Sequence, residues 1–138
     1  MTISLLLSSL VSAQIPNRNT SSLTTAIVDC GNKPNCVSSQ ASAQDKKIAP
    51  VTFNGTAEDF QNAVKEKIAS LPRTKIVNQT DAYFHIEFTT AIMRFTDDVE
   101  LYFDNGLIHV RSASRVGYSD LGANRNRVEE IRKLLQKN

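Results

Sequence analysis

Apolar residues recur with the spacing of a helix in the middle of this chain and with the spacing of strands after it. Between residues 56 and 71 they recur every three or four positions, which is the spacing of a single helix face. Thr56 stands where a helix cap is expected, and Leu71-Pro72 ends the pattern. We therefore predict a helix here, whose buried stripe consists of Phe60, Ala63, Val64, Ile68 and Leu71.

After residue 73 the apolar period becomes two, which is typical of strands with one buried face. Asn105-Gly106 favours a two-residue hairpin turn, and such a turn sets the register of the strands beside it. In this register Phe103 faces Ile108, both are buried, and apolar residues meet on one face of the sheet. The predicted strands are 51–53, 74–79, 82–90, 95–104 and one that begins at Leu107.

The helical spacing returns near the C-terminus, from about Asp120 to Lys137. Ser119 or Asp120 can cap this second helix. Both helices can cover the apolar face of the sheet. The sequence therefore predicts an α+β fold of two layers, in which two helices pack on one face of an antiparallel meander of four to five strands. The buried residues of the last helix are predicted to be Leu121, Val128, Ile131 and Leu135.

The first 47 residues show neither period. Residues 1–13 form a short apolar run that ends in Val-Ser-Ala, which is typical of a signal-peptidase site, although no Lys or Arg precedes the run. We interpret 1–13 as a signal peptide, 14–47 as a polar, loosely ordered arm, and 48–138 as a single folded domain. The signal peptide leads us to expect an exported protein. No stretch reaches the ~20 apolar residues that a transmembrane helix needs, so we expect no transmembrane segment.

Cys30 and Cys36 are the only cysteines, and Pro34 lies in the short loop between them. In an exported protein such a pair most simply forms a disulfide. Two free thiols are the first alternative. A zinc site needs more ligands than the neighbouring sequence offers, and the spacing is not that of a Cys-x-x-Cys redox motif.

The composition is that of one ordinary globular domain, with 41% hydrophobic residues, 22% charged residues and a net charge of +2. The charge is uneven: residues 81–105 sum to −5 (six acids against Arg94), and residues 106–138 sum to +4 (seven bases against three acids). This asymmetry predicts ion pairs between the two segments, and it equally suits an anionic partner at the last helix. Nucleic acid is not expected, because no broad basic stripe is present.

The segment from Arg111 to Arg125 combines arginines, hydroxyls and two glycines that permit a sharp turn. Its arginines would gather near a helix N-terminus, which favours anions. The segment thus suggests a site for a phosphate, a carboxylate or a lipid headgroup. The alternative is internal, with Arg115 paired to Asp120 and the hydroxyls bonded to the turn. The candidate residues are Arg111, Ser112, Ser114, Arg115, Ser119, Asp120, Asn124 and Arg125.

The sheet face opposite the helices is predicted to carry titratable side chains. His85 and His109 flank the central strand, about 10 Å apart by strand spacing. They are therefore too far apart to share a metal, and we expect neither a metal nor a cofactor. Glu100 faces Arg111 and is interpreted as its cross-strand ion-pair partner. The predicted residues of this face are Tyr83, His85, Glu87, Glu100, Tyr102, His109 and Arg111.

Ala91-Ile92-Met93 is an apolar tip between two strands, beside Arg94. It either packs against the end of the core or contacts a membrane surface or a partner.

Several short motifs, in order, resemble the uncharacterised family called domain of unknown function 1499. The resemblance spans roughly residues 30 to 135. It implies a small bacterial envelope protein, with relatives in photosynthetic organisms, and it implies no known activity. The motifs are Cys-Val-Ser-Ser-Gln at 36–40, Leu-Pro-Arg-Thr at 71–74, Phe-Thr-Asp-Asp-Val-Glu at 95–100, and Arg-Ser-Ala-Ser-Arg-Val-Gly-Tyr-Ser-Asp-Leu-Gly at 111–122 with Asn124-Arg125.

Two classes of function remain open. The first is a non-enzymatic envelope module that binds an anionic small molecule, a lipid headgroup or an envelope protein through Arg111–Arg125. The second is an enzyme of unrecognised class that uses His85, Glu87 or the Ser and Asp residues of 112–120. The lack of a nucleophile motif or phosphate loop favours the first. We expect the bacterial periplasm or envelope, or the thylakoid lumen or secretion in a photosynthetic or eukaryotic source.

Overall fold

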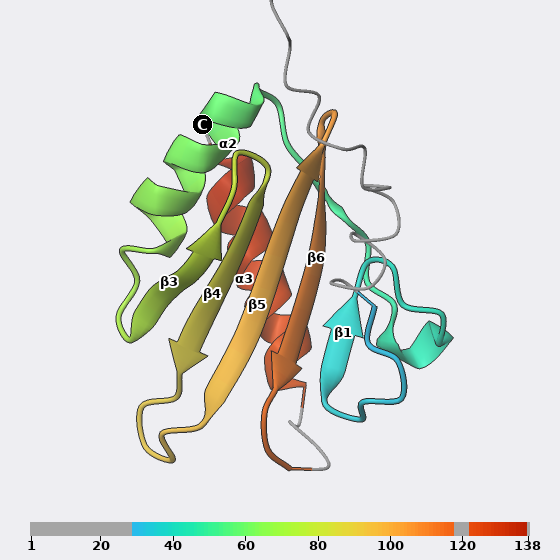
Figure 1. Cartoon of the computed structure of the whole chain (residues 1–138). Coiled ribbons are helices and arrows are strands. Elements are labelled where there is room, and N and C mark those ends of the chain that lie inside the picture. The colour runs from blue at the N-terminus through green and yellow to red at the C-terminus, as the bar shows by residue number, and fades with distance from the viewer. Residues whose placement is uncertain (1–28, 118–121, 138) are drawn as a thin grey trace, which may run out of the picture.

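The computed structural model of this protein describes residues 29–117 and 122–137. Within them, six strands form one antiparallel sheet in the order β1-β6-β5-β4-β3, with β2 also paired to β6 (Figure 1). The α+β class and the antiparallel sheet are as predicted, but the strand count exceeds four to five. The strands are β1 Cys36–Ser38, β2 Val51–Thr52, β3 Thr74–Gln79, β4 Tyr83–Thr89, β5 Thr96–Asp104 and β6 Leu107–Ser114. The helical elements are η1 Gln44–Lys46, α2 Ala57–Ala63, η2 Val64–Ile68 and α3 Ala123–Gln136.

The additional strand lies in the stretch that the sequence suggested to be a loosely ordered arm. β1 pairs with β6, so that Cys36 faces Ala113. Ser39 is buried, and its hydroxyl accepts a hydrogen bond of 2.9 Å from the backbone N–H of Val110. Because such bonds satisfy buried polar groups, a stretch with few apolar residues can enter the interior. The described part of the arm, residues 29–47, therefore packs with the domain.

The hairpin between β5 and β6 has the predicted turn and register. Asn105 and Gly106 both have positive φ, 46° and 87°, as this turn type requires. Phe103 faces Ile108, as predicted. Ile108 is fully buried. Phe103 is only partly buried and packs against the margin of the core, so the prediction that both residues are buried holds fully for Ile108 alone.

The first helix begins as the sequence predicted. Thr56 Oγ1 accepts a hydrogen bond of 3.2 Å from the N–H of Asp59, and Asp59 Oδ2 accepts one of 2.8 Å from the N–H of Thr56. The chain then continues from α2 into the π-helical η2. Phe60, Val64 and Ile68 of the predicted stripe are fully buried, which confirms the face that was predicted.

The last helix is shorter at its start than predicted. It begins at Ala123, after Gly122 with φ of 81°. Val128, Ile131 and Leu135 are buried as predicted. The remaining predicted core residue and the predicted caps, Leu121, Ser119 and Asp120, lie outside the described residues.

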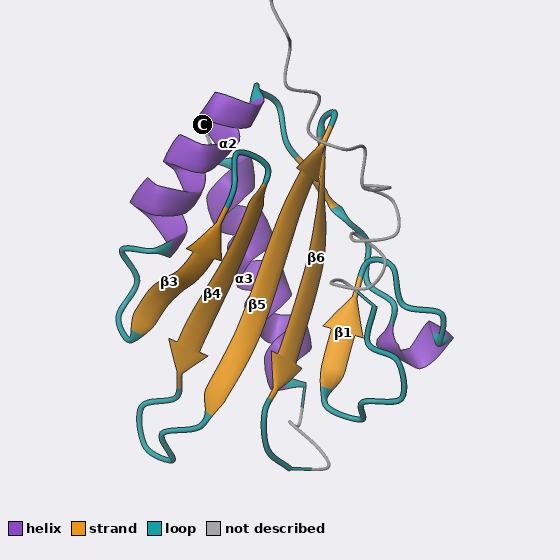
Figure 2. Cartoon of the chain, in the orientation of Figure 1, coloured by secondary structure: helices purple, strands orange, loops and turns teal. Residues whose placement is uncertain are grey.

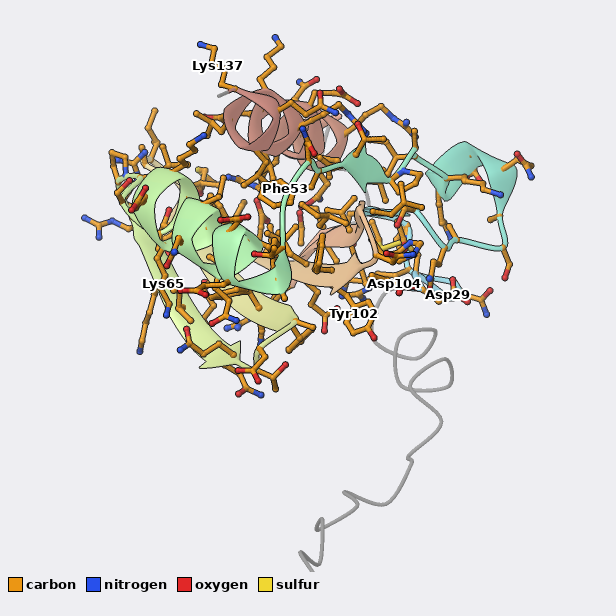
Figure 3. All side chains as sticks on the ribbon, turned by 90° about the horizontal axis from the view of Figure 1, so that it is seen from above. Asp29, Phe53, Lys65, Tyr102, Asp104 and Lys137 are labelled. Carbon is orange, nitrogen blue, oxygen red and sulfur yellow. A yellow bond between two sulfur atoms is a disulfide. The ribbon has the colours of Figure 1, made fainter. Side chains whose placement is uncertain are left out.

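Both long helical elements lie on the same side of the sheet in Figures 1 and 2, and their side chains meet those of the strands in one core. Figure 3 shows this interior from above, with Phe53 between the helices. Phe60 lies at its centre, because its ring stacks on Phe103 at 5.4 Å and meets Phe84 edge-on at 5.5 Å. In the described part of the chain, no helix lies on the opposite face of β4 and β5 (Figure 1).

We expect Phe60→Ala to lower the free energy of unfolding by about 3–5 kcal/mol, because it leaves a cavity among three rings. Val77→Ala is the control, since Val77 is 46% exposed on the edge strand β3; it should change stability by less than about 0.5 kcal/mol. Urea denaturation followed by circular dichroism measures both. A loss below about 1 kcal/mol for Phe60→Ala would contradict this core.

A disulfide joins Cys30 and Cys36, as predicted, and packs against Ala113. Closure of so short a loop contributes roughly 2 kcal/mol by chain entropy. We expect Cys30→Ser/Cys36→Ser to lose this amount in urea denaturation. Dithiothreitol should bring the wild type to the level of the variant and leave the variant unchanged. Two free thiols in unreduced, denatured protein would show that the bond is not formed.

Candidate functional site

Strands β4, β5 and β6 carry a row of polar side chains on the sheet face that the helices leave uncovered. The strict alternation of β4 produces it, because Phe84, Ile86 and Phe88 fill the core and the residues between them point the other way. We call this set of residues the polar face. It consists of Tyr83, His85, Glu87, Asp98, Glu100, Tyr102, His109 and Arg111, with Arg115 just after β6.

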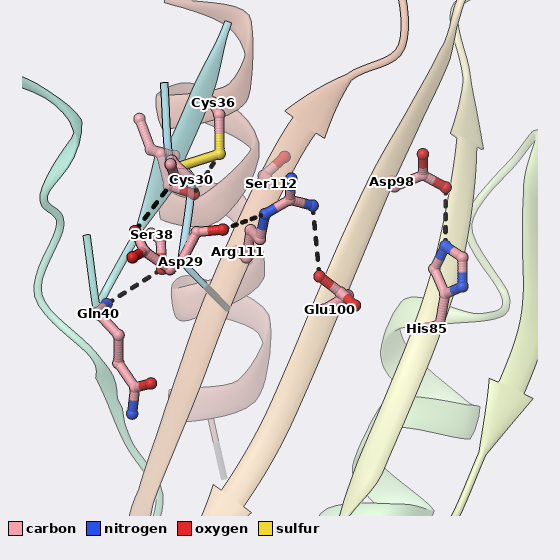
Figure 4. Close-up of polar contacts among 12 residues, drawn as sticks. Asp29, Cys30, Cys36, Ser38, Gln40, His85, Asp98, Glu100, Arg111 and Ser112 are labelled. Atoms are coloured by element: carbon pink, nitrogen blue, oxygen red, sulfur yellow. Dashed lines mark hydrogen bonds and ion pairs between the residues drawn. A yellow bond between two sulfur atoms is a disulfide. The ribbon is translucent and has the colours of Figure 1, made fainter. Parts of the chain in front are cut away.

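At the centre of the polar face, Arg111 and Glu100 form the predicted cross-strand ion pair, with 3.3 Å between Nη1 and Oε2 (Figure 4). Tyr83 donates its hydroxyl to the other oxygen of Glu100 at 2.9 Å. Arg111 Nε also donates to the carbonyl of Asp29 at 3.0 Å. Burial raises the pKa of Glu100, although both Tyr83 and Arg111 favour its charged form. The charge of Arg111 is therefore already matched inside the protein.

A second cluster lies beside it around Asp98. Arg115 donates to both oxygens of Asp98, at 2.8 and 2.9 Å, and to Glu87 at 2.6 Å. His85 Nε2 lies 2.7 Å from Asp98 Oδ1 (Figure 4). Partial burial opposes ionisation of Asp98, but the hydrogen bonds from Arg115 and His85 outweigh it and lower the pKa of Asp98. Arg115 thus links β4 to β5.

The two arginines of this face do not form a free anion site. Two carboxylates, Asp98 and Glu87, already surround the single guanidinium of Arg115, which makes this cluster unfavourable for a further anion. Asp120, the partner predicted for Arg115, lies outside the described residues.

The histidines lie in separate surroundings. His85 contacts Asp98, whereas the Nδ1 atom of His109 lies 3.4 Å from the hydroxyl of Ser39. Across the described ranges, no group of three or more His, Cys, Asp or Glu residues could hold a metal ion.

Three other predicted ligand residues lie inside the protein. Ser112 donates to Asn124 Oδ1 at 2.6 Å, and Asn124 Nδ2 donates to Ser114 Oγ at 2.8 Å and to the carbonyl of Asn35 at 3.1 Å. All four residues are buried. Asn35 in turn donates to the carbonyls of Val116 and Gly117 at 2.7 and 2.8 Å. This network joins α3, the disulfide loop and the end of β6.

The remaining predicted ligand residues do not join Arg111 and Arg115 on the polar face in the described part of the chain. Arg125 donates to the carbonyls of Lys47 and Asp45, at 3.4 and 3.2 Å. Ser119 and Asp120 lie outside the described residues.

Comparison with known protein families gives a match over most of the chain. Residues 26–135 match the family described as "Protein of unknown function (DUF1499)". The chain belongs to the DUF1499 family. Neither the curated proteins nor the solved structures compared with the chain gave a match. Among the residues that the structure describes, no helix has the length and apolar character needed to cross a membrane.

The motif at 95–100, which resembles DUF1499 proteins, places side chains on both faces of the sheet. In the motif at 95–100, Asp98 and Glu100 point to the polar face, while Asp97 is buried and pairs with Arg127 of α3 at 2.9 Å. The sequence prediction of the polar face did not include Asp98. The signal was available, because Asp98 precedes Glu100 by two positions in the same alternating strand.

The lowered pKa of Asp98 predicts a pH-dependent contribution to stability. The ionised Asp98 side chain stabilises the fold at pH values above its ordinary pKa of 3.8. This stabilisation is lost as pH falls through the lower pKa that Asp98 has in the folded protein. We therefore expect the wild type to be more stable than Asp98→Asn at neutral pH, and the difference to shrink below pH 3.8. Urea denaturation across this pH range measures it. A difference that does not change with pH would contradict the assignment.

For Glu100→Gln we expect a pH dependence of stability opposite in sign to that of Asp98→Asn. Because the pKa of Glu100 is raised above 4.5, its ionisation weakens the fold as pH rises through the folded-state value. The stability of the wild type relative to Glu100→Gln should therefore fall with rising pH.

Proposed function

We propose that this DUF1499 protein is a non-enzymatic module of the cell envelope that docks on anionic lipid headgroups. The surface involved is the end of the sheet formed by the β4–β5 connection (residues 90–95), the residues after β6 (115–117) and Arg73 before β3; we call it the sheet end. The observation that supports docking is that exposed apolar side chains occur there together with arginines that form no ion pair within the described residues.

The apolar part of the sheet end consists of large side chains that the core does not use. Ile92 is 90% exposed and Met93 64% exposed, in a loop between two well-formed strands. Phe95 and Val116 beside them are also exposed. Backbone bonds hold these segments together, since the N–H of Arg115 donates to the carbonyl of Thr96 at 3.1 Å. Contiguous exposed apolar residues on a small domain are typical of an interaction surface.

The charged part consists of Arg73 and Arg94. Arg73 Nε donates to the carbonyl of Thr89 at 3.1 Å, which places Arg73 beside the β4–β5 connection. Neither arginine makes an ion pair with any described residue. The acids at this end, Glu87, Asp97 and Asp98, are all paired. The sheet end therefore keeps free positive charge next to apolar side chains, as interfacial membrane anchors do.

Acidic residues outnumber lysines at the opposite end of the described structure, where Lys67 and Lys137 line a hollow together with Gly106. Glu58 and Asp59 lie in the first turn of α2, Asp81 in the β3–β4 turn and Asp104 at the β5–β6 turn. Figure 1 shows these turns at the far end of the sheet from the β4–β5 connection. An anionic surface attracts one end of such a molecule and repels the other, and so orients it.

Location in the envelope is supported by the disulfide, because disulfides persist in oxidising compartments. The anionic partner that the sequence suggested for Arg111–Arg125 is thus proposed at the sheet end, to which this segment contributes residues 115–117.

Docking is tested with a fluorescent reporter, because the chain has no tryptophan. We expect the emission of Ile92→Trp to shift to shorter wavelength when phosphatidylglycerol vesicles are added, since the indole enters the lipid interface. Leu107→Trp is the matched control at the opposite end, where Leu107 is 38% exposed. Its emission should not shift. Equal shifts of the two reporters, or an equal response to phosphatidylcholine vesicles, would contradict the proposal.

The charge contribution is tested in the Ile92→Trp background with Arg73→Asn/Arg94→Asn. Asn suits both positions because their φ angles are 55° and 56°. A basic residue near an anionic membrane contributes about 1 kcal/mol, so the pair should weaken vesicle binding roughly thirtyfold. Lys65→Gln/Lys133→Gln removes the same charge from exposed helix positions and should weaken binding far less.

A further inference from the structure

A hollow of about 500 Å³ lies at the sheet end, between the β4–β5 connection, the end of β6 and the start of α3. Its volume falls in the range of ~300–1,000 Å³ that is usual for small-molecule sites. The residues that line it are Thr90, Ala91, Ile92, Met93, Phe95, Asp97, Ser114, Val116, Gly117 and Ala123.

The polar side chains in this lining already have partners. Thr90 Oγ1 accepts from the N–H of Phe95 at 2.9 Å, Asp97 pairs with Arg127, and Ser114 Oγ accepts from Asn124. Each side-chain hydroxyl or carboxylate among the described lining residues therefore already has a partner. What the lining offers instead is apolar surface, to which Ala91, Ile92, Met93 and Phe95 of the β4–β5 connection contribute. An occupant must accordingly be apolar along the part that enters.

A cation lies next to this apolar wall. Arg94 stands in the chain between Met93 and Phe95, which both line the hollow, and is not itself part of the lining. Arg94 is exposed and makes no ion pair with a described residue. A ligand that places an apolar chain in the hollow can therefore place an anionic group near Arg94.

We infer that this hollow holds the acyl chain of a single-chain anionic amphiphile, with its headgroup near Arg94. The inference rests on the proposed docking at the sheet end and names the ligand class of that surface. It differs in one testable respect: a monomeric amphiphile should bind in the absence of any membrane. The two proposals can therefore fail separately.

The first measurement is isothermal titration of the full chain with octanoate, decanoate and dodecanoate, each below its micellar concentration. Each methylene that enters the hollow should raise the affinity by up to about fourfold. The gain should stop once the hollow is full. Alkyl maltosides of the same chain lengths should bind more weakly, because they lack the anionic group. An affinity that does not depend on chain length overturns the inference.

The second measurement uses variants that fill the hollow. Ala123→Phe places a ring in the space from the α3 side, and Ala91→Phe does so from the loop side. Each should lower decanoate affinity at least tenfold. Asn126→Phe adds the same ring at an exposed position of α3 and should leave the affinity unchanged. Folding of both filling variants is checked by circular dichroism against the wild type. If one of them is not folded, decanoate binding is measured with the other. Decanoate binding that survives in a folded filling variant overturns the inference.

Arg94→Asn separates the headgroup from the chain. It should weaken decanoate binding but not decyl maltoside binding, and an equal effect on both contradicts the headgroup assignment. Vesicle docking reported by Ile92→Trp with no decanoate binding would overturn the acyl-chain site alone. Decanoate binding that Ala123→Phe abolishes, without any vesicle docking, would overturn the membrane proposal alone.

Discussion

The register of the β5–β6 hairpin determines which side chains meet in this protein. Strand side chains alternate, so a slip of one residue would move every side chain of β6 to the other face. With the turn at Asn105-Gly106, Arg111 lies opposite Glu100 on the polar face, and Val110 lies opposite Leu101 in the core. The same register directs Ser112 and Ser114 inward toward α3, where Asn124 meets both hydroxyls. The register set by this turn thus places the charged residues on one face of the sheet, and the core with its buried polar network on the other.

The uneven charge of the sequence has its explanation in this arrangement. Three acids of β5, Asp97, Asp98 and Glu100, point to both faces and are matched by arginines from the C-terminal part of the chain. Asp98 and Glu100 bind Arg115 and Arg111 on the outer face. Asp97 binds Arg127 on the inner face, where the guanidinium also lies 4.5 Å from the centre of the Phe88 ring. Since a buried carboxylate needs a partner, these arginines stabilise the fold, and their charge is not available to a ligand.

Sequence reasoning succeeded where the signal was local and failed where a partner was distant. The capped first helix, its stripe and the hairpin register depend on neighbouring residues, and each is found as predicted. β1 was missed because three residues carry no period, and its support comes from bonds such as Ser39 to Val110, 71 positions apart. The strand partners of Arg115 were missed for the same reason: Asp98 and Glu87 precede it by 17 and 28 positions. Such pairs become visible only when the strand order is known.

The β4–β5 connection differs from the rest of the sheet because its large apolar residues have no role in the packing of the core. Neither Ile92 nor Met93 belongs to the core, and their apolar surface stays in water at a cost of ~25 cal/mol per Å² relative to burial. The hairpin itself does not depend on these side chains, because β4 and β5 pair along seven residue pairs from Tyr83–Tyr102 to Thr89–Thr96. Changes at Ile92, Met93 and Arg94 should therefore leave the fold intact. A loss of binding in such variants can then be attributed to the sheet end itself.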